Sequence, residues 1–274
     1  MCAPTDRGPV FPPIARAAQD KSDAYSSVSG RADCFSYQPT FPEITCTRGD
    51  LSSPVRVALV GNSHAGEWLP AVEQIADRSH WHITTYLASD CALSEVPQHF
   101  TPSAVSVACT AWVRRTTARI VAGRYRLVVM SNKVSRSAVG HDLAGSWAPY
   151  ERGYLTVLRA LQRAHVRVVG IRDTPSPARQ SIPTCLAQHP SDYARCDGSR
   201  RAWLPPEPLV PAVAALRDRQ ITVVDLTDHL CRPQVCPAIV GRVVVYFDAS
   251  HLTATYARTL APYLAVPLRA ALAG

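Results

Sequence analysis

Short apolar runs alternate with amphipathic stretches from residue 55 to the C-terminal end of this 274-residue chain. The runs have the length and the β-branched content of buried strands, and the stretches between them carry apolar residues at helical spacing. Strands that alternate with helices form right-handed βαβ units, which build a mostly parallel sheet covered on both faces. The chain is therefore predicted to be an α/β protein. Strands are expected over 55–60, 81–88, 126–131, 166–171 and 221–226, and helices after 69, near 108–122, over 149–163, near 208–219 and over 252–272.

Residues 1–54 differ in composition and in hydrophobic pattern from the rest of the chain. They hold many Pro, Ser and Asp residues with little hydrophobic periodicity, so we predict an irregular linking extension packed on a single α/β domain of residues 55–274. No apolar run approaches the roughly 18 residues of a membrane span. The N-terminus, Met1-Cys2-Ala3-Pro4, lacks the basic and apolar segments of a signal peptide.

Nine cysteines bear on the compartment in which the chain folds. Eight of them form four close pairs in sequence order, within or beside Pro-, Ser- and Asp-rich segments where loops rather than core strands are expected, and Cys2 is left over. This pattern is typical of loops closed by disulfides in an oxidising compartment, although the connectivity stays open, with sequential pairing preferred. Because no C-x₂-C knuckle or tight Cys/His cluster is present, no metal site is expected. The pairs are Cys34/Cys46, Cys91/Cys109, Cys185/Cys196 and Cys231/Cys236.

The formal net charge of +8 carries little functional information. Of the 29 basic residues, 27 are arginine, and the only adjacent basic pairs are Arg114-Arg115 and Arg200-Arg201. A nucleic-acid surface would concentrate such charge along one face or one helix. The scattered pattern favours a solvated basic surface, and no nucleic-acid partner is expected.

Ser63 lies in the turn from the first predicted strand into the first helix, in the sequence Gly61-Asn62-Ser63. In a parallel sheet, ligands bind beyond the carboxyl ends of the strands, where this turn lies. A serine at this point exposes its hydroxyl, and its backbone N–H lies near the positive end of a helix, so it offers a nucleophile and one oxyanion donor. Taken alone, the same sequence is better explained by a serine that caps the helix.

Asp248 and His251 precede the last predicted helix, in the sequence Asp248-Ala249-Ser250-His251. The three-residue spacing lets the carboxylate reach Nδ1 of the imidazole, fix its tautomer and leave Nε2 free to take a proton from a serine. A capping aspartate beside a surface histidine would explain this motif alone. Because the serine motif follows the first strand and this motif precedes the last helix, the two together favour a Ser-His-Asp site.

On these two motifs the chain resembles the SGNH (GDSL-like) hydrolase family. The resemblance rests on Val-Ala-Leu-Val-Gly61-Asn62-Ser63-His64 and on Asp248-Ala249-Ser250-His251-Leu252. More narrowly, Ser63-His64-Ala65, Cys91 and the run 246–252 are similar to the extracytoplasmic SGNH domain fused behind integral-membrane acyltransferase-3 proteins. The resemblance implies a three-layer α/β/α sandwich whose mostly parallel, flavodoxin-like sheet has five strands.

The resemblance also implies roles for individual residues. Ser63 would be the nucleophile, His251 the general base and Asp248 the acid that orients it. Ser63 N–H and the side chain of Asn132 would form the oxyanion hole, and Asn62 and His64 would line the pocket. A glycine that the family places after the second strand is missing, because Ser89-Asp90-Cys91 stands there. No cofactor is implied.

The function expected from this resemblance is O-acyl transfer, with acetyl as the expected acyl group, to or from a cell-envelope carbohydrate. The partners would be an acyl donor, a carbohydrate acceptor and an N-terminal acyltransferase-3 membrane domain in a longer chain, and the isolated domain is expected to be monomeric. It would lie on the periplasmic or cell-wall side, tethered to the membrane. Two alternatives stay open at this point, a catalytically weak carbohydrate-binding module and a standalone secreted esterase.

Overall fold

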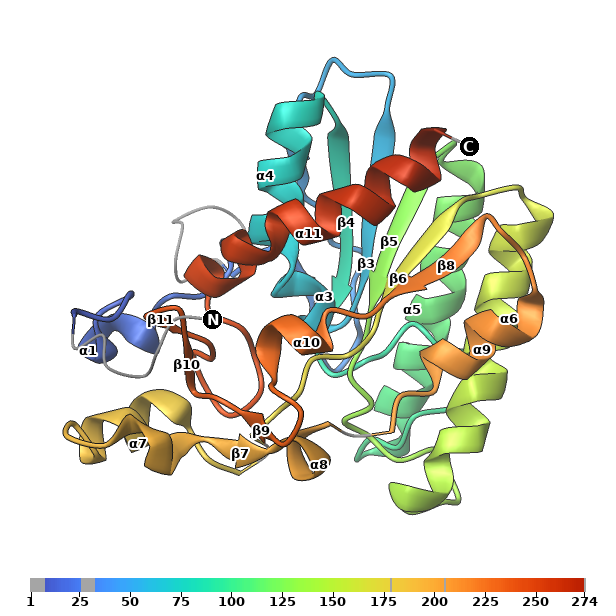
Figure 1. Ribbon diagram of the computed structural model, residues 1–274. Helices are drawn as coiled ribbons and strands as arrows, with labels where there is room; N and C mark the ends of the chain where they lie inside the picture. The colour runs from blue at the N-terminus through green and yellow to red at the C-terminus, as the bar shows by residue number, and fades with distance from the viewer. Residues whose placement is uncertain (1–7, 26–32, 178, 205, 274) are drawn as a thin grey trace.

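A computed structural model describes residues 8–25, 33–177, 179–204 and 206–273, and it shows a sheet between two layers of helices (Figure 1). Five parallel strands form the centre of the sheet in the order β4-β3-β5-β6-β8. The second of these strands along the chain lies on one side of the first, and the others follow on its other side, which is the flavodoxin-like order. The predicted fold class is confirmed. The five strands are β3 (Arg56–Gly61), β4 (His82–Ala88), β5 (Leu127–Ser131), β6 (Val168–Ile171) and β8 (Ile221–Val224).

Two short strands from the N-terminal extension enlarge this sheet to seven strands. β1 (Phe35–Ser36) runs parallel to β4, and β2 (Thr47–Gly49) runs antiparallel to it. The structure here differs from the predicted irregular extension, because strands of two or three residues are too short to show an alternating pattern in the sequence. Other parts of the extension, residues 1–7 and 26–32, lie outside the described residues.

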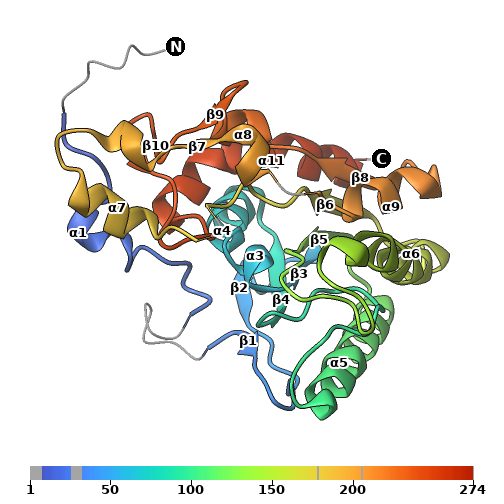
Figure 2. The same cartoon turned by 90° about the horizontal axis from the view of Figure 1, so that it is seen from below.

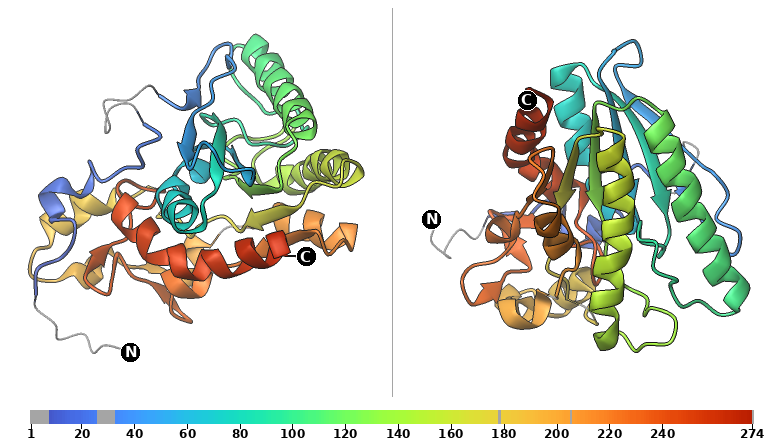
Figure 3. Two further views of the ribbon diagram at one scale, coloured as in Figure 1. Left: turned by 90° about the horizontal axis from the view of Figure 1, so that it is seen from above. Right: turned by 90° about the vertical axis from the view of Figure 1, so that its right-hand side faces the viewer.

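The two faces of the sheet are covered by different helices (Figure 3). Val57 and Leu59 of β3 point into one apolar core, and Ala58 and Val60 point into the other. Both sets of side chains are buried, which explains why β3 is apolar throughout rather than alternating. The first face is covered by α4 (Leu69–Ser79) and α11 (Ala254–Ala273), and the second by α5 (Ser103–Ala122), α6 (Trp147–Arg163) and α9 (Leu209–Leu216).

The long connections gather beyond the carboxyl ends of the strands, at the bottom of Figure 1. The excursion after β6 and the one after β8 are joined there by an antiparallel pair, β7 with β9. These segments enclose the end of the sheet at which a ligand site was predicted. They comprise α7 (Ile182–Gln188), β7 (Gly198–Ser199), α8 (Arg200–Trp203), α10 (Thr227–Leu230), β9 (Val235–Cys236), β10 (Ile239–Val240) and β11 (Val243–Val244), beside α1 (Ile14–Ala17) of the extension.

Four disulfides join the cysteine pairs in sequence order, as predicted. Each closes a short loop, with separations of 12, 18, 11 and 5 residues along the chain. Cys34–Cys46 joins the segment before β1 to the one before β2, and Cys91–Cys109 fastens the loop after β4 to α5. Disulfides of this kind persist in oxidising compartments. Cys2 lies outside the described residues.

The surroundings of the disulfide between Cys185 and Cys196 differ from those predicted. Both cysteines were expected in loops rather than core strands, but Cys185 lies in α7, and Cys196 is the last residue of a short 3-10 helix, η2 (Tyr193–Cys196). Cys196 is fully buried and belongs to the apolar core on the α4 and α11 side of the sheet. A cysteine in a disulfide is apolar, so it favours burial wherever the chain folds over it. The predicted pairing is thus confirmed, and neither cysteine lies in a core strand, although Cys185 lies in a helix rather than in a loop. Cys34, Cys91, Cys109 and Cys236 are fully buried in the same way.

Replacing both Cys91 and Cys109 by serine is expected to lower the free energy of unfolding by about 3 kcal/mol, because the unfolded chain loses a closed loop. The same replacement of Cys231 and Cys236 should cost less, about 2 kcal/mol, because that loop is shorter. Urea unfolding of the two variants beside the parent chain measures both values. Equal losses, or the reverse order, would show that loop closure does not set the contribution of these bonds.

Candidate active site

The turn after β3 leads into the short helix α3 (Ser63–Gly66) at the carboxyl end of the sheet (Figure 2), and Ser63 follows this turn. Gly61 has φ 144°, and a Cβ added to it would lie 1.8 Å from the backbone oxygen of Ser131, so the residue there must be glycine. Ser63 is the first residue of α3 and is partly exposed.

Asn62, rather than Ser63, caps this helix. Its Oδ1 accepts the N–H of His64 at 3.1 Å and that of Lys133, after β5, at 3.1 Å, and its Nδ2 donates to the Lys133 carbonyl at 2.7 Å. Asn62 is 1% exposed, so it lies beneath the site and ties two neighbouring strand ends together rather than forming a pocket wall. The Ser63 hydroxyl is therefore not needed as a cap.

Ser63, His251 and Asp248 form one continuous hydrogen-bonded arrangement. Ser63 Oγ lies 2.8 Å from His251 Nε2, and His251 Nδ1 lies 2.7 Å from Asp248 Oδ2. The other carboxylate oxygen of Asp248 accepts the N–H groups of Ser250 at 2.7 Å and of His251 at 2.8 Å. Because the carboxylate accepts at Nδ1, that nitrogen carries the proton and Nε2 is left to accept from Ser63.

Asp248 is held as a carboxylate by its surroundings. Partial burial by itself would raise its pKa, but the hydrogen bond and the charge of His251, together with the two backbone N–H groups, lower the pKa to about 2. The stabilisation that this pairing gives the fold is therefore present above the ordinary value of 3.8 and is lost as the pH falls from about 4 to about 2. At neutral pH the group that orients His251 is ionised.

The segment that carries His251 is fastened to the body of the domain by buried groups. Glu67 Oε2 accepts the N–H of Leu252 at 2.8 Å, and Glu67 Oε1 accepts the hydroxyl of Thr174 at 3.0 Å. From the other side, Ser176 donates to the carbonyl of Ala249 at 3.3 Å. Glu67 is fully buried, and burial raises its pKa well above the ordinary value, against the opposing effect of the Leu252 N–H.

Glu67→Gln is expected to change how stability depends on pH. A raised pKa means that the stabilisation due to neutral Glu67 is fully present below pH 4.5 and declines as the pH rises toward its folded-state value. Glutamine resembles neutral Glu67 and does not titrate, so the melting temperature of the parent chain should fall progressively below that of the variant as the pH rises above about 5. A difference that stays constant as the pH rises would contradict a neutral Glu67. Glu67→Ala, which leaves two polar groups unpaired, should cost about 1–3 kcal/mol for each.

Asn132 lies at the end of β5, next to the turn that carries Ser63. It is 1% exposed, and its Oδ1 accepts the N–H of Leu93 at 2.8 Å. Its Nδ2 finds no acceptor among the described residues, so a buried donor is left over at the edge of the site. Asp90, in the segment after β4, accepts hydrogen bonds from Ser135 and Arg136 of the neighbouring loop.

His64 was expected to line the pocket, but it is 1% exposed and lies beneath His251. Its Nδ1 lies 2.7 Å from Asp173 Oδ1, and its Nε2 lies 3.1 Å from Ser250 Oγ. Asp173, Ser250 and Glu67 were not predicted from the sequence as site residues. Asp173 follows β6 at the carboxyl end of the sheet, and that position was the available signal for it.

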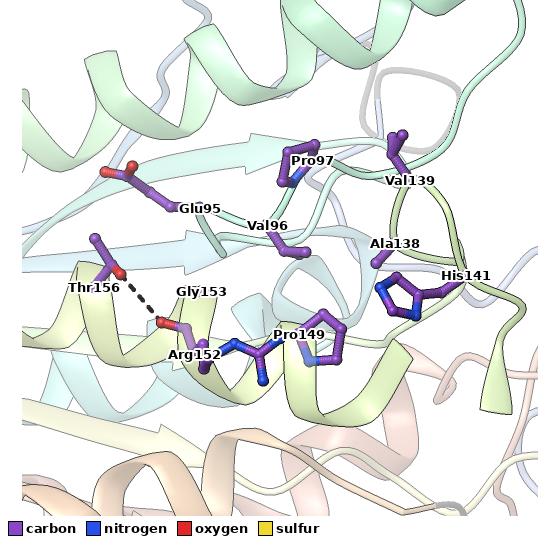
Figure 4. A pocket seen from close by; sticks show the side chains of 10 residues that line it. All are labelled: Glu95, Val96, Pro97, Ala138, Val139, His141, Pro149, Arg152, Gly153 and Thr156. Atoms are coloured by element: carbon purple, nitrogen blue, oxygen red, sulfur yellow. Dashed lines mark hydrogen bonds between the residues drawn. The ribbon is translucent and has the colours of Figure 1, made fainter. Parts of the chain in front are cut away.

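Two cavities lie between the loops after β4 and β5 and the helices α5 and α6, and none of the predicted site residues lines them. The first has a volume of about 370 Å³, with Glu95, His141 and Arg152 in its wall (Figure 4). The second has a volume of about 820 Å³ and is bounded by Phe100, Val107 and residues of α5. Among the described residues, no group of three or more His, Cys, Asp or Glu side chains could hold a metal ion, and no helix is long and apolar enough to cross a membrane.

Comparisons with known proteins agree with this architecture. A family model described as the SGNH domain fused to AT3 domains matches residues 33–265. The periplasmic domain of a lipopolysaccharide acetyltransferase from Salmonella ser. Paratyphi A is similar in structure, with a TM-score of 0.60 and 12% identity over 81% of this chain and 86% of that one. A Bacteroides fragilis NCTC 9343 protein that carries an acylhydrolase assignment gives a TM-score of 0.47 and 12% identity, over 82% and 91%. No curated protein gives a significant match.

Proposed function

The chain belongs to the family of SGNH domains fused to AT3 domains, and we propose that it transfers an O-acyl group through an acyl-enzyme formed on Ser63. The observation that carries this proposal is the unbroken arrangement from Ser63 through His251 to Asp248, with distances of 2.8 and 2.7 Å. It holds a hydroxyl, a base and an ionised carboxylate in the relative positions that acyl transfer through a serine needs.

In the first half-reaction, His251 Nε2 takes the proton of Ser63 as Oγ attacks the carbonyl carbon of an acyl ester. The carbonyl electron pair moves onto its oxygen and then returns as the bond to the leaving alcohol breaks. His251 gives its proton to that alcohol, which leaves an ester on Ser63. Asp248 stays ionised throughout, because it stabilises the imidazolium without accepting its proton.

Two groups are proposed to stabilise the negative oxygen of the intermediate. The N–H of Ser63, the first residue of α3, has no partner within its own helix. The unpaired Nδ2 of Asn132 is the second donor. A pair of donors of this kind is worth more in a site that excludes water than in solution, since it is oriented before the charge develops.

In the second half-reaction, a hydroxyl replaces the leaving alcohol and gives its proton to His251 as it attacks the Ser63 ester. We propose a carbohydrate of the cell envelope as the acceptor and acetyl as the acyl group. Support comes from the Salmonella domain of similar fold, which belongs to a lipopolysaccharide acetyltransferase, and from the family, whose members are fused to AT3 domains. Water in place of the sugar would make the same site an esterase.

The proposed location is outside the cytoplasm, next to a membrane domain of the AT3 type. The four disulfides support an oxidising compartment, and the family supports the membrane partner. In this arrangement the membrane domain would supply the acyl donor, and the domain described here would deliver the group to the carbohydrate.

The proposal is tested by incubating the chain with p-nitrophenyl acetate, with and without an envelope polysaccharide. Release of nitrophenol is expected in both cases, and acetyl esters should accumulate on the polysaccharide if a sugar is the acceptor. Nitrophenol release without sugar acetylation would identify an esterase. No release and no acetylation would contradict enzymatic acyl transfer.

A further inference from the structure

A second hydrogen-bonded chain reaches the proposed base from the side opposite Ser63. It runs from Asp173 through His64 to Ser250, with distances of 2.7 and 3.1 Å, and ends 3.4 Å from His251 Nδ1. The rings of His64 and His251 lie 4.8 Å apart between centroids. Ser250 therefore stands between two imidazoles, on the Nδ1 side of His251, whereas Ser63 is at Nε2.

The surroundings of His64 determine which of its nitrogens carries the proton. Nδ1 faces Asp173 Oδ1 at 2.7 Å, Thr174 Oγ1 at 3.4 Å and Glu67 Oε1 at 3.7 Å. Asp173 Oδ1 also accepts the Thr174 N–H at 2.9 Å, and the Thr174 hydroxyl donates to Glu67. Burial raises the pKa of Asp173 to about 7, so at pH 8 Asp173 is ionised and its Oδ1 is the main acceptor that faces Nδ1, with Thr174 Oγ1 as a weaker one. Nδ1 therefore carries the proton, and Nε2 accepts from Ser250.

His64 stays neutral in this position. Its imidazole is buried, and burial, followed by the charges of His251 and Lys133, lowers its pKa well below the ordinary value. A neutral His64 with its proton on Nδ1 has a lone pair at Nε2, so the Ser250 O–H must point toward His64. A lone pair of Ser250 Oγ is then left toward the Nδ1–H of His251.

We propose that Asp173 sets the direction of this chain and that, through His64 and Ser250, it supplies a second acceptor for the Nδ1–H of His251. This inference rests on the proposed function. His64, Asp173 and Ser250 are positioning residues, because they act on His251 and not on the acyl group. These hydrogen bonds would favour the tautomer of His251 that can accept the Ser63 proton. They would also stabilise the His251 imidazolium, in addition to the stabilisation that Asp248 provides.

The geometry favours this role over a second nucleophile at Ser250. The hydroxyl of Ser250 is on the Nδ1 side of His251, where Asp248 also lies, and the carboxylate occupies that side at 2.7 Å. The 3.4 Å contact is longer than the Asp248 contact, so its contribution is smaller. Ser250 is therefore a secondary acceptor for the Nδ1–H of His251, and Asp248 is the main one.

A double-mutant cycle on the 274-residue chain tests the proposal at pH 8, with p-nitrophenyl acetate hydrolysis as the activity. Groups in one network are coupled by amounts that correspond to roughly 2- to 150-fold in rate. We expect Ser250→Ala and Asp173→Asn each to lower kcat by about 5-fold, and the double variant to be lower by about 5-fold as well. KM should change little in all three. Asp197→Asn, a partly buried aspartate that accepts the Ala238 N–H far from His64 in the sequence, is the matched control and should leave kcat unchanged.

Losses that multiply, giving about 25-fold in the double variant, would show that Asp173 does not act through Ser250 and would overturn the proposal. An unchanged kcat in Ser250→Ala would also overturn it. A second measurement does not depend on activity. Long-range ¹H–¹⁵N correlation spectra of the wild-type chain with labelled histidine report the tautomer of His64.

We expect the proton of His64 on Nδ1, and a proton on Nε2 would overturn the proposal. The two measurements also separate this inference from the proposed function. If the wild-type protein neither hydrolyses nor transfers an ester, the proposed function fails. The His64 spectrum still decides whether the hydrogen bonds from Asp173 through His64 to Ser250 run in the stated direction.

Discussion

Ser63→Ala should lower ester hydrolysis and acyl transfer by roughly 10⁴- to 10⁶-fold, the range of loss seen when a serine nucleophile is removed. The alanine side chain cannot form the ester on which both half-reactions depend. The free energy of unfolding should stay within about 1 kcal/mol of the parent value, because the variant loses one hydrogen bond and no cap. Steady-state kinetics with p-nitrophenyl acetate, together with urea unfolding, measure both quantities.

Asn62→Ala is the matched control for this variant, one residue away. Asn62 accepts two backbone N–H groups and donates to a carbonyl, so its loss should cost about 1–2 kcal/mol of stability. Ser63 is thus expected to matter for chemistry and Asn62 for the fold. A large drop in stability for Ser63→Ala with activity retained would assign Ser63 to the structure of the turn and reject it as the nucleophile.

Asp248→Asn should lower kcat by about 10⁴-fold with little change in KM. The asparagine amide can donate to His251 Nδ1, which places the imidazole proton on Nε2, where it can no longer accept from Ser63. The backbone N–H groups of Ser250 and His251 keep an acceptor in the amide oxygen, so the segment should hold its shape. The expected loss of kcat therefore comes from the wrong tautomer of His251 and from the missing carboxylate charge, and not from a change in the geometry of the segment.

The control for this variant is Asp228→Asn. Asp228 pairs with Arg200 at 2.7 Å, but its side chain is 86% exposed, so the pair is worth little and lies outside the site. The kcat of the Asp228→Asn variant should equal that of the parent chain. An equally small effect for Asp248→Asn would mean that His251 is not oriented by this carboxylate.

Strand positions could be predicted from the sequence because four of the five central strands, all except the edge strand β8, are largely buried on both faces. β3 and β5 read as continuous apolar runs. The observed β3 is shifted by one residue at both ends, and β5 begins one residue later than predicted and ends at the predicted residue. β1 and β2 could not be found in this way, since two or three residues carry no periodicity. What places them is the neighbouring edge of β4, together with the Cys34–Cys46 bond.

The two ends of the candidate site could be predicted because each depends on local spacing. Asp248 reaches His251 across one turn of chain, and Ser63 follows a strand end. Asp173 follows a strand end, which the sequence displays, but no local pattern assigned a role to Asp173 or to Glu67. Their roles depend on buried contacts, of Asp173 with His64 and of Glu67 with Leu252, and each contact joins residues more than 100 positions apart in the sequence.

Cysteine pairing and cysteine burial differ in the same way. The pairing of Cys185 with Cys196 follows from a separation of 11 residues, which the sequence displays directly. The complete burial of Cys196 depends on how the excursion after β6 folds back over the core, and no local pattern encodes that arrangement.

The identity of the helix cap shows the same limit on a smaller scale. The sequence Gly61-Asn62-Ser63 offers two residues able to cap α3, and local propensity ranks them almost equally. The tertiary contact of Asn62 with the loop after β5 decides between them. Once Asn62 takes that role, the Ser63 hydroxyl is free for His251.

The central claim is that Ser63 is an activated nucleophile, and covalent labelling tests it most directly. The folded wild-type chain would be incubated with a fluorophosphonate, digested and mapped by mass spectrometry. One label is expected, on the peptide that holds Ser63, and it should be absent from Ser63→Ala and from the unfolded chain. A chain that hydrolyses esters while Ser63 stays unlabelled, or that carries the label on another residue, would contradict the claim.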